Sequence, residues 1–322
     1  MSRVEKALWT WLQLLRAPNL FTVPGDPLAG YILASFGSVG PAIFCAVGAS
    51  LCLYAAGLLD NDLADLAEDR AERPARPLPS GAARPRAVAT TAIALTAAGL
   101  LLAAAAGVTT FYVALVLTGL IALYNHCTKP LRVVGALNMG LCRGTSVLLG
   151  ATAAPHGDLT IPLLFRGRLE PLHIAMLTMT VYIAAVTNLA RHETKETAPA
   201  AAKGLPLAAL LFGTIAFLRD LPHPSLAGGL TQLFAELTPS TFWSVLFLFV
   251  VAASISGKIA WSLAQDPAPP IPPAIGQSIR LLLLLQAAFC AANGSPAGAI
   301  AAMLLMILWP LSRAASQRFY AS

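Results

Sequence analysis

The stretch NDLADLAED, residues 61–69, lies between two apolar segments at 39–60 and 86–107 that are each long enough to cross a bilayer. Four of its nine residues carry carboxylates, although only 11% of the whole chain is charged. On a helix, Asp62, Asp65 and Asp69 would lie within about 60° of one another, because successive residues are about 100° apart. Such a face attracts hard cations, and Mg²⁺ commonly combines one or two carboxylates with the phosphate oxygens of a substrate. The stretch therefore predicts a membrane protein that binds a lipid with phosphates.

Composition places the chain among polytopic membrane proteins. It has 322 residues, of which 57% are hydrophobic, and its mean hydropathy is +0.70. The polar stretches between apolar segments are too short to form a second folded domain. We therefore expect an all-α transmembrane bundle of about nine to ten helices, formed by a single domain over residues 1–322. The candidate spans are 12–36, 39–60, 86–107, 109–125, 134–153, 171–190, 203–219, 241–263, 275–293 and 295–313.

The basic residues indicate how the chain is oriented. With ten spans, most Lys and Arg fall in loops on one side, which predicts that both termini are cytoplasmic in a bacterial cytoplasmic membrane. The net charge of +6 and the pI near 9.3 follow from this bias. Anionic membrane lipids are sufficient partners for such a charge. Neither a nucleic acid nor an obligate protein partner is expected.

A basic, proline-rich loop follows the carboxylates and reads RAERPARPLPSG over residues 70–81. Arginine binds phosphate in bidentate fashion, so the loop and the carboxylates would hold one diphosphate from two sides. The other interpretation is a solvated acidic helix end followed by an ordinary cytoplasmic loop. That interpretation accounts neither for the spacing of the aspartates on one face nor for the RPLPSG run.

These motifs resemble those of the UbiA superfamily of intramembrane prenyltransferases. The family pattern NDxxDxxxD is matched by Asn61, Asp62, Asp65 and Asp69, and RPLPSG by residues 76–81. The resemblance covers most of the chain and extends to RAPN at 16–19 and YNHCTK at 124–129. Within the superfamily, residues 135–144 and 181–187 look most like the EboC branch.

The resemblance implies a helical bundle with a central cavity open to the lipid, in which two Mg²⁺ ions bind an isoprenyl diphosphate. Loss of diphosphate gives an allylic carbocation, which an aromatic or other lipophilic acceptor captures while apolar walls exclude water. The expected catalytic residues are Asp62, Asp65, Arg76 and Lys129. The expected metal ligands are Asn61, Asp62, Asp65, Asp69, Glu193 and Glu196. The expected substrate-binding residues are Asn19, Arg73, Tyr124, Asn138, Arg143 and Arg191.

The chain departs from the family pattern after the sixth span. There the family has two or three aspartates, whereas this chain reads NLARHETKE over residues 188–196. Glu193 and Glu196 could form a weaker second metal site, Arg191 and Lys195 could replace the charge of the metal, or the site has lost catalysis. The last case gives the alternative function, a non-catalytic isoprenoid-binding or export-linked membrane protein. A phosphatidyl-type alcohol transferase is disfavoured, because the glycine and arginine pattern expected between its acidic residues is missing.

Arg143 and Asp26 stand out among the charged residues that fall inside predicted spans. A centrally placed Arg costs about 2.5–3.5 kcal/mol on the insertion scale, so it usually faces a cavity or a partner. Arg143 is expected either to line the polar end of the cavity with Asn138 or to pair with a carboxylate or carbonyl. Asp26 lies among three prolines that must disturb the first helix, near Asn19, which matches a family position facing the active site. Asp26 itself is either functional or a satisfied structural residue.

Overall fold

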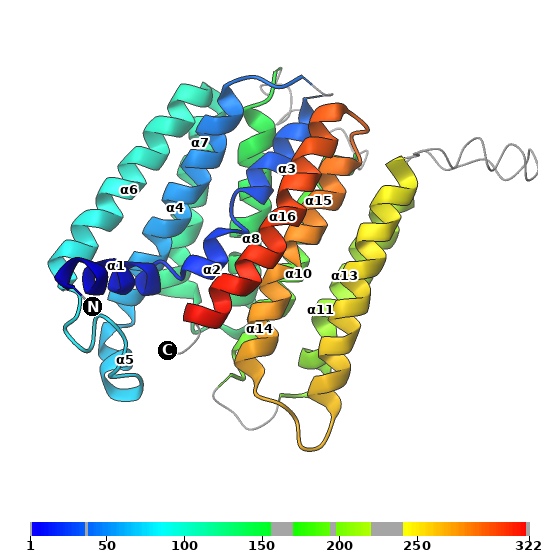
Figure 1. Cartoon of the computed structure of the whole chain (residues 1–322). Helices are drawn as coiled ribbons and strands as arrows, with labels where there is room; N and C mark the ends of the chain where they lie inside the picture. The colour runs from blue at the N-terminus through cyan, green and yellow to red at the C-terminus, as the bar shows by residue number, and fades with distance from the viewer. Residues whose placement is uncertain (1, 36–37, 156–169, 194–197, 220–240, 320–322) are drawn as a thin grey trace, which may run out of the picture.

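The computed structural model describes residues 2–35, 38–155, 170–193, 198–219 and 241–319 (Figure 1). Within these ranges, nine helices are long and apolar enough to cross a membrane, which confirms the expected all-α polytopic bundle. The spanning helices are α4 (Ala42–Ala64), α6 (Pro85–Ala106), α7 (Val108–Leu123) with the turn η1 (Tyr124–Thr128), α8 (Arg132–Thr152), α10 (Pro171–Ala190), α11 (Ala200–Arg219), α13 (Thr241–Ala264), α14 (Ile271–Arg280) with α15 (Leu282–Ala291), and α16 (Pro296–Phe319).

The predicted first span, 12–36, is wrong as a single helix. Its residues divide among the end of α1 (Arg3–Leu14), the short α2 (Ala17–Leu20) and α3 (Gly25–Ala34). The chain turns at Arg16, whose φ of 45° lies in the left-handed region. Pro24 and Pro27 stand at the start of α3, because proline can begin a helix but cannot continue one.

The broken segment still crosses the bundle. In Figure 1, α1 lies across the ends of α4 and α6, whereas α2 and α3 run inward and up through the molecule. The nine spans of the described ranges agree with the expected nine to ten helices, and the broken segment is not counted among them. Figure 1 shows α1, α5 (Leu66–Glu72) and the end of α16 at the same end of the bundle.

Glycines let α3 and α8 touch backbone to backbone. A Cβ added at Gly30 would lie 1.8 Å from the Val147 carbonyl oxygen, and one at Gly150 would lie 1.8 Å from that of Pro27. Small residues commonly allow such close approach between membrane helices. Because α8 also packs on α10, the three helices form one continuous inner group.

Large apolar side chains lie both in the core of the bundle and on its outer surface. The main core contains Phe217, Phe249 and Phe289, which are fully buried and lie ring to ring. On α6, by contrast, Ile93 and Leu101 are 70% and 72% exposed. An outer surface of this kind is suited to hydrocarbon, as the hydropathy of the spans predicts.

The acidic stretch is helical but not one continuous helix. Helix α4 ends at Ala64 and α5 begins at Leu66, with Asp65 at the joint. The amide of Asp65 donates to the Asn61 carbonyl at 2.9 Å, and the amide of Asp69 donates to the Asp65 carbonyl at 2.8 Å. Helical hydrogen bonding thus continues across the joint, which keeps the aspartates near one another.

Candidate active site

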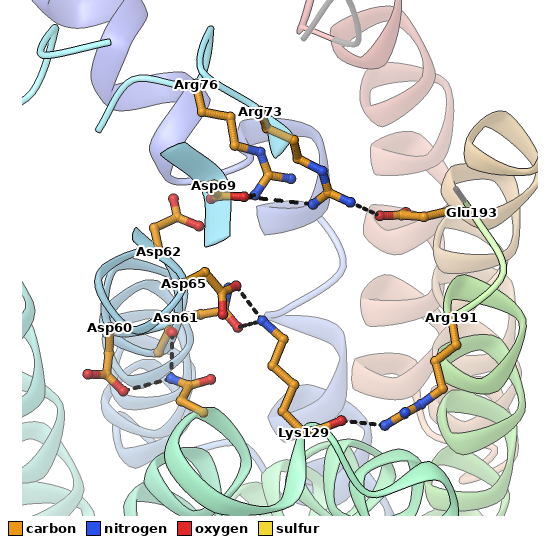
Figure 2. A network of polar contacts seen from close by, with 12 residues as sticks. Asp60, Asn61, Asp62, Asp65, Asp69, Arg73, Arg76, Lys129, Arg191 and Glu193 are labelled. Carbon is orange, nitrogen blue, oxygen red and sulfur yellow. Dashed lines mark hydrogen bonds and ion pairs between the residues drawn. The ribbon is translucent and has the colours of Figure 1, made fainter. Parts of the chain in front are cut away.

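Two of the aspartates in residues 61–69 are bound by arginines. The Oδ1 of Asp62 accepts a hydrogen bond from Arg16 at 3.2 Å. Asp69 accepts two from the Nη1 of Arg76, at 3.0 and 2.9 Å (Figure 2). The Asp62 and Asp69 side chains are only 13% and 6% exposed. Since a buried carboxylate needs a compensating partner, these arginines stabilise the acidic stretch.

Asp65 is bound by Lys129, which follows the turn η1. The Nζ of Lys129 pairs with Asp65 and donates to the Oδ1 of Asn61 at 3.3 Å. Asn61 in turn donates to the Oδ2 of Asp65 at 2.9 Å. Turn η1 is a π-helix, closed by the bond from the Lys129 amide to the Tyr124 carbonyl at 3.1 Å. Such turns are frequent at functional sites, because they redirect the side chains at a helix end.

Arg73 joins this cluster to the segment after α10. Its Nη2 donates to the Oε1 of Glu193 at 2.8 Å, and its Nη1 lies 4.0 Å from the Oδ1 of Asp69. Figure 2 shows Glu193 facing the same polar cluster as the aspartates. Glu196 and Lys195, also singled out in the sequence, lie outside the described residues.

Arg191 and Asn138 brace the turn that carries Lys129. The Nη2 of Arg191 donates to the carbonyls of Lys129 and Leu131, at 2.6 and 3.0 Å. Asn138, on α8, donates to the Oγ1 of Thr128 at 2.9 Å. Both side chains are therefore bound to protein, and their predicted contacts with substrate stay predictions.

Arg143 belongs to a second, buried polar group. Its Nη1 lies 3.0 Å from the Oδ2 of Asp26, and its Nη2 donates to the carbonyl and hydroxyl of Thr22 at 3.2 and 3.1 Å. Gln286 donates to the Oδ1 of Asp26 at 2.6 Å and to the Thr22 carbonyl at 2.8 Å. The Asp26 side chain is 0% exposed and that of Arg143 8%. The structure thus shows the carboxylate pairing expected for Arg143, and a substrate contact stays a prediction.

The remaining predicted substrate residues are half-buried. Asn19 lies in α2, where its carbonyl accepts hydrogen bonds from the Thr22 amide at 3.0 Å and the Thr22 hydroxyl at 2.8 Å. Tyr124 begins η1. Nothing in these two placements tests a contact with substrate.

Several polar residues of the site region were not predicted as functional. Arg16 belongs to the RAPN motif, and it binds Asp62 of the site, a contact that its place in the sequence does not predict. Gln286 is a lone polar residue in an apolar run, which was the available signal. Asp60 forms a separate group with Asn125 and His126. It directly precedes the acidic motif in the sequence, and its position there does not indicate a separate group.

The oxygen donors of the acidic stretch fit Mg²⁺. Across the described residues, no three Asp, Glu, His or Cys side chains gather closely enough to hold a metal, since each aspartate of the motif faces a cation. The available donors are nevertheless hard oxygens on adjoining turns, those of Asn61, Asp62, Asp65 and Asp69. Mg²⁺ needs only one or two carboxylates when waters and phosphates complete its shell.

Comparisons with known proteins agree with this arrangement. The sequence matches the UbiA prenyltransferase family over residues 27–270, which is most of the chain. A digeranylgeranylglyceryl phosphate synthase of Sulfolobus acidocaldarius is 28% identical over 157 residues, 48% of this chain and 57% of the relative. The chain thus spans about half the length of the curated relatives it matches.

Solved structures share the fold. A UbiA homologue from Aeropyrum pernix K1 has a TM-score of 0.57 and 17% identity, over 85% of this chain and 97% of that one. A UbiA homologue from Archaeoglobus fulgidus, bound to DMAPP and Mg²⁺, has a TM-score of 0.58 and 14% identity, over 88% and 99%. Placement in the EboC branch stays a prediction. With its nine apolar helices in the described ranges, the chain is an integral multi-pass membrane protein, and it belongs to the UbiA prenyltransferase family.

Proposed function

We propose that the protein is a Mg²⁺-dependent prenyltransferase, which moves an isoprenyl group from its diphosphate to a lipophilic acceptor. The observation that carries the proposal is the meeting of the acidic stretch and the adjoining Arg73 with Lys129 and Glu193, which come from two other parts of the chain (Figure 2). Carboxylates for a metal and cations for phosphate are thereby in contact. Family membership supports the same chemistry, as does the A. fulgidus homologue that binds DMAPP and Mg²⁺.

The metal would be held by the oxygens of Asn61, Asp62, Asp65 and Asp69. When bound, Mg²⁺ supplies positive charge that neutralises the leaving diphosphate. Glu193 is the described candidate for a second metal position, and its ion pair with Arg73 places its carboxylate at the cluster. We propose that Glu196 assists it there.

Arg73, Arg76 and Lys129 would bind the diphosphate oxygens. Each is already positioned in the cluster by a carboxylate partner, which it would exchange for phosphate oxygens when a diphosphate and Mg²⁺ bind. The two arginines can bind phosphate through bidentate hydrogen bonds, whereas the lysine acts as a compact charge. Arg191 and Asn138 keep the lysine in place from behind.

The proposed reaction breaks the bond between C1 of the isoprenyl group and the diphosphate oxygen. The electron pair leaves with the diphosphate, which the three cations receive, and C1 becomes an allylic cation. The acceptor then forms a bond to C1 and loses a proton. The central apolar cavity expected from the family would exclude water, which otherwise captures the cation.

We further propose that the protein lies in a bacterial cytoplasmic membrane with both termini cytoplasmic. The bias of Lys and Arg toward the loops on one side supports this orientation.

Diphosphate release by purified protein tests the proposal. The protein in detergent is supplied with isoprenyl diphosphates of increasing chain length, with aromatic and other lipophilic acceptors, and with either Mg²⁺ or EDTA. We expect release that requires Mg²⁺ and is lost in Asp65→Asn. The matched control is Glu68→Gln, which removes the same charge from an exposed position of the same segment and should leave release unchanged.

Binding of isoprenyl diphosphate without release, for every chain length and acceptor, would overturn the proposal. That result would favour the non-catalytic, isoprenoid-binding alternative. Release that persists in Asp65→Asn would contradict the metal assignment. Binding is measured separately, by displacement of a fluorescent isoprenyl diphosphate, so that the two functions are distinguished.

A further inference from the structure

A groove of about 420 Å³ opens between α4, α6 and α7. Leu53 lies on its α4 wall, Ile93 and Leu100 on its α6 wall, and Ile121 on its α7 wall. Ile93 is 70% exposed, so the groove opens to the surroundings of the bundle. Its volume falls in the range of about 300–1,000 Å³ typical of small-molecule sites.

One end of the groove is polar. The Nε2 of His126 lies 3.2 and 3.0 Å from the two carboxylate oxygens of Asp60, and both residues line the groove. Asn125 donates to the Oδ2 of Asp60 at 2.7 Å and so holds the carboxylate from the other side. The Asp60 side chain is 33% exposed and that of His126 54%, so an entering molecule can reach them.

The rest of the lining offers little polar chemistry. Thr96 and Thr118 also line the groove, but their hydroxyls donate to carbonyls of their own helices, Ala92 at 2.9 Å and Ala114 at 2.8 Å. A ligand therefore meets hydrocarbon along the groove and hydrogen-bonding groups at one end.

The groove is distinct from the diphosphate cluster. Asp60 and Asn61 are neighbours in sequence, yet Asp60 binds His126 whereas Asn61 binds Lys129 and Asp65. Figure 2 shows Asp60 projecting from α4 away from Lys129. The turn η1 thus contributes His126 to the groove, and Lys129, which directly follows the turn, lies at the diphosphate cluster.

The polar end selects the chemistry of the head group. A phosphate or carboxylate head would meet the carboxylate of Asp60. A cationic head would compete with donors that both Asp60 oxygens already have. A hydroxyl can both donate and accept, so it suits the exposed imidazole in either tautomer.

We propose that this groove binds a single-chain lipid alcohol, with its hydroxyl at His126 and its chain between Leu53 and Leu100. The site is separate from prenyl transfer and does not rest on the proposed function.

Photo-crosslinking in phosphatidylcholine nanodiscs tests this site without an activity measurement. The probe is hexadecanol carrying a diazirine in its chain, and labelled peptides are mapped by mass spectrometry. Hexadecane, hexadecylamine and palmitate with the same diazirine serve as matched probes. We expect the alcohol to label α4, α6 and α7 at the groove more strongly than the other three probes do.

Three variants separate the chain contact from the head contact. Ala97→Trp fills the groove and should abolish its labelling, whereas Ala105→Trp, at an exposed position of the same helix outside the groove, should not. His126→Ala should lower labelling by the alcohol about tenfold, as expected for one lost hydrogen bond, and leave hexadecane unaffected. Equal labelling by hexadecane, stronger labelling by the amine or palmitate, or no labelling at the groove would each overturn the proposal.

Discussion

Replacing Arg143 with methionine would leave the Asp26 carboxylate without the guanidinium that lies 3.0 Å from it. The Asp26 side chain is 0% exposed, so water cannot take the place of the lost partner. Removing one member of a buried ion pair costs about 3–5 kcal/mol, because a buried charge is left uncompensated. For a chain of this size, where about 2 °C corresponds to 1 kcal/mol, we expect the unfolding temperature to fall by about 6–10 °C.

The double variant Asp26→Asn/Arg143→Met is the matched control. It removes both charges, and the introduced amide side chain retains an oxygen that can accept the hydrogen bond that Gln286 donates at 2.6 Å. The interaction energy between contacting residues of this kind is about 0.5–3 kcal/mol, so the double variant should unfold at a higher temperature than Arg143→Met alone.

The assay is thermal unfolding in detergent, followed by intrinsic fluorescence, with diphosphate release measured below the unfolding temperature of every variant. An unfolding temperature for Arg143→Met close to that of the wild type would refute the reasoning about the buried pair. A raised KM that persists in the stabilised double variant would instead support the predicted contact of Arg143 with substrate.

Three further outcomes follow from the cluster and the helix contacts. Lys129→Met should lower the rate of diphosphate release about 10²–10³-fold, the usual effect of losing a charge-stabilising donor, whereas Lys129→Arg should keep part of the wild-type rate. Equal rates in the two variants would contradict a role for the Lys129 charge in diphosphate release. Arg191→Met should lower kcat more than it raises KM, because it frees the turn that carries Lys129, and Arg191→Lys should restore part of kcat. An unchanged kcat in Arg191→Met would exclude a role for Arg191 in positioning Lys129. Gly150→Val would force a Cβ to within 1.8 Å of the Pro27 carbonyl oxygen, so we expect no monodisperse peak on size exclusion, and a normal peak would argue against the close contact.

The spans could be predicted to within a few residues, because bilayer thickness fixes the length of an apolar segment. The first span could not. Its prolines were visible, but the left-handed turn at Arg16 depends on where the segment packs. A proline-containing run permits either a kinked helix or a broken one.

The composition of the site was predictable, but its pairing was not. Local spacing and the family resemblance brought together the aspartates, the arginine loop and Lys129. Arg16 and Asp62 are 46 residues apart, and Arg73 and Glu193 are 120 apart, so their contacts depend on how distant helices approach. No local pattern encodes such an approach.

The interruption between α2 and α3 makes three remote parts of the sequence depend on one another. It presents the Thr22 carbonyl to side-chain donors from α8 and α15, Arg143 and Gln286, which act where a straight helix would use its own amide. Hydrocarbon provides no water for that purpose. In a descendant with a straight helix here, the backbone would satisfy its own hydrogen bonds. The arginine and the glutamine would then lose the Thr22 carbonyl as an acceptor, although they would still lie in apolar helices. Selection should therefore keep or discard the break and its two donors together.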